Sequence, residues 1–197
     1  MLNPAIKSLT LSWDMAADAN HTGFEIYRSA NNTGANLVLI TSLLRTERSY
    51  LDESLTANSH YSYQVRAIYA NSAPQDSTIV SKPTLVAEPT NLTISNTTET
   101  SALLSWQSSN GLDDLCFLIK NSSSPVVEQC LADVLQFQYQ FNSLTTDTTY
   151  QVTLQAKGID GNKSAVAITS YVTDSTPLSF ETDVYQPFTN FLSDNSC

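Results

Sequence analysis

The stretch LTANSHYSYQVRA, which spans Leu55 to Ala67, carries the clearest structural signal in the chain. A leucine opens it, a polar bend follows, and Tyr61 then begins a segment in which Tyr63 and Val65 alternate with polar residues. An alternation of period two indicates a strand with one buried and one solvated face. A leucine, a bend and a strand-opening tyrosine predict a tyrosine corner, in which the phenol packs inward and its hydroxyl bonds nearby backbone.

The same pattern returns at LTTDTTYQVTLQA, from Leu144 to Ala156, with Tyr150 at the strand-opening position. Because one tyrosine corner belongs to one β-sandwich, two copies predict two sandwich domains. Trp13 and Trp106 end similar strand motifs ahead of the corners, LTLSW and ALLSW, and we expect both indole rings in the cores.

The composition suits two ordinary globular domains. A chain of 197 residues that is 41% hydrophobic can bury two cores, and only 14% of its residues are charged. The net charge of −10 with nine scattered lysines and arginines disfavours nucleic acid and anionic membrane surfaces as partners. No apolar run approaches the length of a transmembrane helix, so membrane insertion is not expected.

Short strands and frequent turns fill the chain, without helical periodicity of useful length. We predict an all-β protein of two tandem immunoglobulin-like Greek-key β-sandwiches, at residues 1–84 and 85–173, followed by an extended C-terminal tail at 174–197. A short linker is expected at residues 84–88, and the last strand of domain 1 at residues 77–81. Few residues precede Trp13, so the first strand of domain 1 is expected to be short or missing.

The motifs LTLSW, ALLSW and GFEIYRS, together with the two corners, resemble tandem fibronectin type III domains. The segment KGIDGNKSA, from Lys157 to Ala165, resembles the turn between the last two strands in bacterial versions of this module. The resemblance covers about residues 1 to 173 and implies seven-strand sandwiches without a conserved disulfide between the sheets. It implies no activity, because this fold serves adhesion, spacing, receptor and accessory roles alike.

No catalytic, cofactor-binding or metal-binding site is predicted. The two histidines, His21 and His60, lack further ligands at metal-binding spacing and are read as solvated side chains. A nucleophile motif of the G-x-S-x-G type is absent from the sequence. The oxygen-rich loops at residues 14–20 and 160–162 lack the spacing of a calcium loop and are read as Asx turns. We therefore predict that the chain is not an enzyme and needs no cofactor.

The cysteines suggest one disulfide. Cys116 and Cys130 bracket a hairpin that turns at residues 121–124, and antiparallel neighbours can come within disulfide reach. A bond between them is predicted in an oxidising compartment, and the alternative is two free thiols on one hairpin. Cys197 has no partner in this interpretation.

Asn-x-Ser/Thr sequons mark candidate glycosylation sites, whose use would depend on the host. They lie at Asn20, Asn31, Asn91, Asn96, Asn121 and Asn162.

Two sandwich modules without a catalytic constellation favour a non-catalytic extracellular protein, a structural or adhesive subunit of a surface assembly. One alternative is a ligand-binding receptor ectodomain, which would expose aromatic side chains around residues 84–88. Another is an accessory or spacer module of a larger secreted enzyme or cytochrome. A glycan-binding accessory module needs an aromatic platform, for which Tyr27 and Tyr69 are the obvious strand candidates.

The tail has the pattern of a strand with one apolar face. Its large side chains make it a candidate docking segment for a neighbouring copy or another subunit of the assembly, most plausibly on the unfilled edge of domain 1. Repeating such a contact would build a ring or a filament. The alternatives are a tail folded back on domain 2 or a linker into a third domain. The docking residues are Leu178, Phe180, Val184, Tyr185, Phe188 and Phe191.

Overall fold

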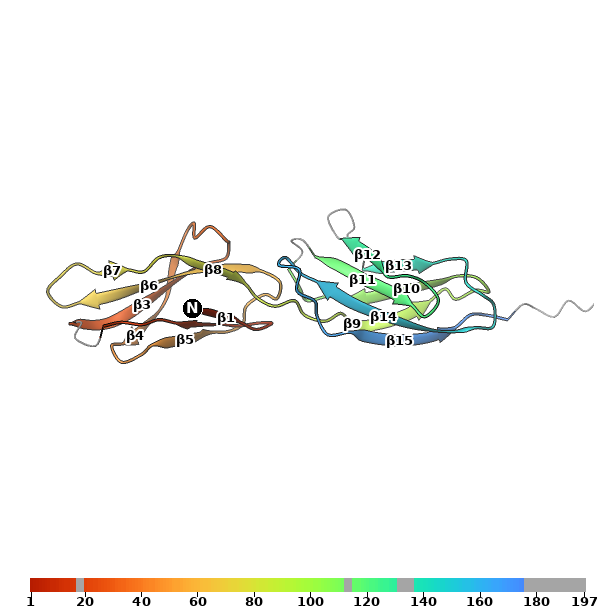
Figure 1. The fold of residues 1–197 in the computed structure, drawn as a ribbon, viewed down its shortest axis with the longest axis horizontal. Coiled ribbons are helices and arrows are strands. Elements are labelled where there is room, and N and C mark those ends of the chain that lie inside the picture. The colour runs from red at the N-terminus through yellow and green to blue at the C-terminus, as the bar shows by residue number, and fades with distance from the viewer. Residues whose placement is uncertain (17–19, 112–114, 131–136, 176–197) are drawn as a thin grey trace, which may run out of the picture.

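A computed structural model describes residues 1–16, 20–111, 115–130 and 137–175. These residues form strands and connecting loops, with no helix among them, and build two β-sandwiches that lie end to end (Figure 1). The predicted all-β fold is therefore confirmed. Within the same ranges there is no helix long and apolar enough to cross a membrane.

Domain 1 contains two antiparallel sheets. One has the order β1-β2-β5 and the other the order β4-β3-β6, with β7 and β8 both pairing β6. The strands are β1 Leu2–Pro4, β2 Leu9–Ser12, β3 His21–Ser29, β4 Val38–Leu44, β5 Ser49–Asp52, β6 His60–Tyr69, β7 Gln75–Asp76 and β8 Val80–Pro83.

Domain 2 repeats this architecture with sheets of order β9-β10-β13 and β12-β11-β14-β15. Its strands are β9 Thr90–Ser95, β10 Ala102–Gln107, β11 Cys116–Asn121, β12 Val127–Cys130, β13 Gln138–Phe141, β14 Thr149–Lys157 and β15 Ala167–Val172. Period-two burial is clearest in β14, where Tyr150, Val152, Leu154 and Ala156 are buried between more exposed neighbours.

The cores form between the two sheets of each domain. In domain 2, the buried Trp106 packs edge-to-face on Phe117, with ring centroids 5.0 Å apart. In domain 1, Trp13 packs in the same way on Phe24 at 5.3 Å, but it is only partly buried. Trp13 thus packs against the core of domain 1 without being fully buried in it.

The exposure of Trp13 has a cause in the neighbouring strands. The sequence predicted one continuous last strand for domain 1, at residues 77–81. Instead, two short strands, β7 and β8, pair with β6, and the segment between them does not pair as a regular strand. Trp13 lies just after the end of β2 and lines a cleft of about 300 Å³ beside this interruption, together with Met1, Val65 and Val80.

The first strand of domain 1 is short but present. The three residues of β1 pair with β2, and the Ser12 amide extends this pairing to the Met1 carbonyl at 2.9 Å. The edge of β2 that the sequence interpretation left open for a docking strand is therefore filled by the chain itself.

Domain 1 also contains an ion pair with a buried carboxylate, which the sequence pattern did not predict. Asp52 accepts hydrogen bonds from Arg28 at 3.0 Å and from the Tyr63 hydroxyl at 2.7 Å. Burial, and then the hydrogen bond to Asp52, raise the pKa of Tyr63 well above its usual value. Because the Asp52 carboxylate is buried, these donors replace the water that it loses on folding.

Candidate functional site: the junction between the domains

Each corner loop is fixed by the hydroxyl of its tyrosine. Tyr61 accepts a hydrogen bond from the Thr56 amide at 3.0 Å, and Tyr150 accepts one from the Thr145 amide at 2.9 Å. In domain 1 the loop turns at Asn58, which has a left-handed φ of 51°. Asparagine tolerates this conformation better than most residues, so the sequence suits the turn.

Asn58 joins the two domains. Its side-chain amide donates to the Gly111 carbonyl at 3.1 Å, and its side-chain oxygen accepts the Ile159 amide at 2.9 Å. The backbone of the same loop adds a third link, since the Gly111 amide donates to the Ala57 carbonyl at 2.7 Å. Asn58 is buried, so both of its side-chain bonds are shielded from water.

Two glycines of domain 2 permit this close approach. A Cβ atom at Gly111 would lie 2.5 Å from the Ser59 hydroxyl and 2.9 Å from the Asn58 carbonyl oxygen. A Cβ atom at Gly158 would overlap the Asn58 side-chain oxygen. Both positions lie in loops of domain 2 that the corner loop of domain 1 contacts, so the lack of side chains is part of the fit.

The connecting segment is packed rather than loose. Thr84, Val86 and Ala87, in the short linker expected at residues 84–88, are buried. The Asn110 side chain makes two hydrogen bonds with the backbone of Ala87. Its oxygen accepts the Ala87 N–H at 2.6 Å, and its NH₂ group donates to the Ala87 carbonyl at 2.9 Å. The junction therefore combines a covalent link, a clamp and a bridging side chain.

This arrangement can fix the orientation of one domain relative to the other. A hydrogen bond contributes about 0.5–1.5 kcal/mol net of solvation by water, so a bend that breaks both side-chain bonds of Asn58 is opposed by about 1–3 kcal/mol. Among the described residues, the contacts that join the domains here are hydrogen bonds between amide groups, which can hold two domains in place.

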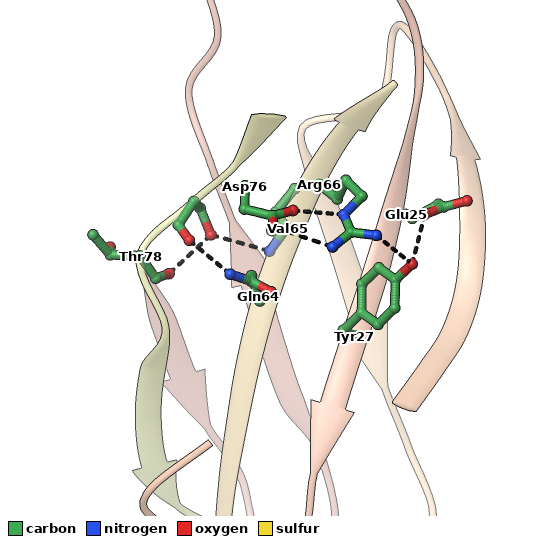
Figure 2. A network of polar contacts seen from close by, with 8 residues as sticks. Glu25, Tyr27, Gln64, Val65, Arg66, Asp76 and Thr78 are labelled. Carbon is green, nitrogen blue, oxygen red and sulfur yellow. Dashed lines mark hydrogen bonds and ion pairs between the residues drawn. The ribbon is translucent and has the colours of Figure 1, made fainter. Parts of the chain in front are cut away.

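A second polar cluster covers the outer face of domain 1. Figure 2 shows Arg66 between Asp76 and Tyr27, with Arg66 to Asp76 contacts of 2.6 and 3.1 Å. Tyr27 accepts a hydrogen bond from Arg66 at 3.1 Å and donates one to Glu25 at 2.8 Å. The bond to Glu25 raises the pKa of Tyr27, and the Arg66 guanidinium lowers the pKa of the Asp76 carboxyl.

The same cluster covers one ring face of Tyr27, a candidate for a sugar platform. The Arg66 guanidinium carbon lies 4.7 Å from the centre of the Tyr27 ring and covers one ring face. Tyr69, the other strand candidate, donates its hydroxyl to Gln75 at 3.3 Å. Stacking on a sugar needs an open ring face, and at Tyr27 the cation takes one of the two.

Cys116 and Cys130 are bonded to each other and face one another directly in the pairing of β11 with β12. The Glu128 carboxylate lies near both sulfurs, and these three ligand atoms fall within 4.8 Å of one another. Because both sulfurs are held in the disulfide, neither offers a thiolate to a metal ion in this state.

The histidines do not share a site. His21 is buried, against the expectation of a solvated ring, because its Nε2 lies 3.0 Å from the Arg45 carbonyl and its ring packs on Phe24 at 4.8 Å. His60 is partly buried at the start of β6 and lines a polar cleft with Asn31 and Tyr61.

The sequons differ in accessibility. Asn121 is buried, and the Asn31 side chain accepts several backbone and hydroxyl donors while its amide donates to the Ala35 carbonyl at 2.8 Å. The other four asparagines are exposed at Asn20, Asn91, Asn96 and Asn162. The docking residues expected in the tail, from Leu178 to Phe191, lie outside the described residues.

Comparison with known proteins agrees with this fold. The model of the fibronectin type III domain family matches residues 87–170. Exoglucanase B of Cellulomonas fimi is 29% identical over 183 residues, a match that covers 85% of this chain and 16% of the enzyme. The chain thus spans about a sixth of that relative's length.

A segment of two fibronectin type III domains from chicken tenascin has a similar structure, with a TM-score of 0.66 at 18% sequence identity, over 88% of this chain and 97% of the segment. That likeness concerns the fold, and it includes both domains. The second domain therefore matches the sequence model of the fibronectin type III family, and both domains share the fold of the tenascin segment.

Proposed function

We propose that this chain is a non-catalytic extracellular spacer, which holds what lies on either side of it at a fixed separation and orientation. The observation that carries the proposal is the bridge made by Asn58, whose buried side chain bonds Gly111 and Ile159 of the other domain. A flexible tether needs no contact between its domains, whereas here the buried Asn58 side chain bonds two loops of the other domain.

Two further observations support the proposal. The match to exoglucanase B covers a small part of that enzyme, as expected for a module shared with a larger protein. The bond between Cys116 and Cys130 suits an oxidising compartment, which favours a location outside the cytosol.

The test compares two matched variants by small-angle X-ray scattering. Asn58→Gly removes the bridging amide while keeping a residue that tolerates the left-handed backbone. Asn36→Gly is the control, because Asn36 is exposed and has a similar φ of 56°. We expect Asn58→Gly to broaden the distribution of domain separations and Asn36→Gly to leave it unchanged. Equal scattering from all three proteins, or a broad distribution in the unmodified chain, would contradict the spacer.

A structural subunit that forms filaments through its tail stays a prediction. Its expected acceptor, an open edge of β2, is filled by β1, so tail exchange would need another surface. A chain that ends at Asp174, compared with the full chain by light scattering, tests it directly. Equal assembly of the two would exclude tail exchange.

A further inference from the structure

The end of domain 2 that lies away from domain 1 repeats the half of the junction that domain 1 supplies. Asp147 takes the place of Asn58 when the chain is counted from the two corner tyrosines, and its φ of 48° matches the 51° of Asn58. Ser143 likewise repeats the left-handed conformation of Ser54, at 56° and 61°. The corner loops thus have the same backbone course at these positions.

The hydrogen bonds around the two loops correspond as well. In domain 1 the Thr84 hydroxyl donates to the Thr56 carbonyl at 2.7 Å, and in domain 2 the Thr173 hydroxyl donates to the Thr145 carbonyl at 2.6 Å. The Ser59 amide donates to the Thr84 hydroxyl at 3.1 Å, as the Thr148 amide does to Thr173 at 3.0 Å.

The residue that leaves each domain is held in the same way. The backbone N–H of Asn58 donates to the Leu85 carbonyl at 3.2 Å, and the backbone N–H of Asp147 donates to the Asp174 carbonyl at 3.3 Å. The Leu85 amide reaches the Ala5 carbonyl at 2.9 Å, and the Asp174 amide reaches the Thr98 carbonyl at 3.2 Å. The chain therefore leaves domain 2 along the path that, after domain 1, leads into a docked domain.

One difference lies at the tip. Asn58 is buried by domain 2, whereas Asp147 is exposed. Asparagine both donates and accepts, and it satisfies one carbonyl and one amide. An ionised aspartate only accepts hydrogen bonds. Asp147 can therefore accept an N–H from a docked domain, as Asn58 does from Ile159, but it cannot donate to a carbonyl, as Asn58 does to Gly111.

We propose that this end of domain 2 is a docking site for a third β-sandwich domain linked in tandem, whose turns present N–H donors to Asp147. The inference rests on the proposed spacer function and extends the fixed geometry by one more joint.

A second copy of the chain could offer the end of its domain 1 that faces away from domain 2, but that end would fit this docking site poorly. Tyr69 stands where Gly158 stands when both are counted from the corner tyrosines, and the junction tolerates no Cβ atom at Gly158. Head-to-tail pairing of two copies through this geometry would place a tyrosine against the Asp147 loop. A domain with a small residue in that turn, as in domain 2 itself, fits.

The test joins a known occupant to the end of domain 2, in place of residues 174–197. A second copy of residues 85–175 follows Thr173, so that the Asp147 loop meets the same domain surface that Asn58 meets in the first junction. The measurement is amide hydrogen exchange at Gly111 and Ile159 in both copies, since these two N–H groups bond across the junction. We expect protection in both copies, and about tenfold faster exchange at the second Ile159 in Asp147→Gly.

Asp147→Asn supplies the missing donor and should slow exchange at the second junction, while Asp14→Asn, at an exposed residue of domain 1, should leave it unchanged. Unprotected amides in the second copy beside protected ones in the first would overturn this inference alone. Unprotected amides in the first copy would overturn the spacer itself. Dimerisation of the unmodified chain that Asp147→Gly abolishes would overturn the choice of occupant.

Discussion

At the scale of single residues, the corner tyrosines and Trp106 could be placed from sequence, because alternation and spacing determine which side of a strand they occupy. Asp52 could not, because its burial depends on Arg28, which lies on another strand. Asn58 could not either, since a polar residue in a loop has the same local pattern whether it faces water or a second domain.

The two tryptophans should differ in their contribution to stability. Trp106→Ala should lower the free energy of unfolding of domain 2 by about 3–5 kcal/mol, because it removes a buried ring. Trp13→Ala should cost domain 1 about 1–2 kcal/mol, because part of the ring already faces solvent. Urea unfolding of the two variants measures this, and equal losses would show that the two sites are equivalent after all.

Alkaline pH should destabilise the protein through its buried tyrosines. Burial, with a smaller effect of Tyr150, raises the pKa of Tyr171 from 10.0 to about 12. The unfolded chain therefore loses this proton first, so the stabilisation is complete below about pH 10 and declines as the pH rises toward 12.

Tyr171→Phe is the matched variant for that decline, because no described atom bonds the Tyr171 hydroxyl. At pH 7 the variant should be as stable as the unmodified protein. Between pH 10 and pH 12 it should lose less stability than the unmodified protein does. Thermal unfolding across this range measures it. Parallel losses in the two proteins would exclude Tyr171 as a cause.

At the scale of elements, the strands with clear alternation matched their expected positions, and the differences lie at domain edges. The last strand of domain 1 splits into β7 and β8, where the Ser77 hydroxyl accepts the Val65 amide at 3.0 Å in place of a regular ladder. Such a side-chain substitute for a strand bond leaves the hydrophobic pattern unaltered, so sequence alone gives no sign of it.

The hairpin of β11 and β12 should depend on its disulfide. The bond links residues 14 apart in sequence, and closing a loop of this size contributes about 3 kcal/mol in the chain-entropy account. Replacing Cys116 and Cys130 together by serine should therefore lower the stability of domain 2 and leave that of domain 1 unchanged. Calorimetry resolves the two domains, and an unchanged melting of domain 2 would show that the bond adds no stability.

At the scale of the whole molecule, sequence predicted two sandwich domains but not their relation to each other. The repeated corner motif carries the domain count, whereas the orientation depends on contacts of Asn58 with two loops far along the chain. Gly111 and Gly158 were the available signals, but a glycine in a turn usually marks backbone conformation and does not identify a docking surface.

The most direct test of the fixed junction is a set of N–H residual dipolar couplings from the unmodified chain in a dilute aligning medium. If the domains form one rigid body, as the contacts across Asn58 require, couplings from the described residues within 1–83 and within 90–173 fit a single alignment tensor with the domain orientation of Figure 1. Two tensors of clearly different magnitude would show independent motion of the domains and would contradict the spacer.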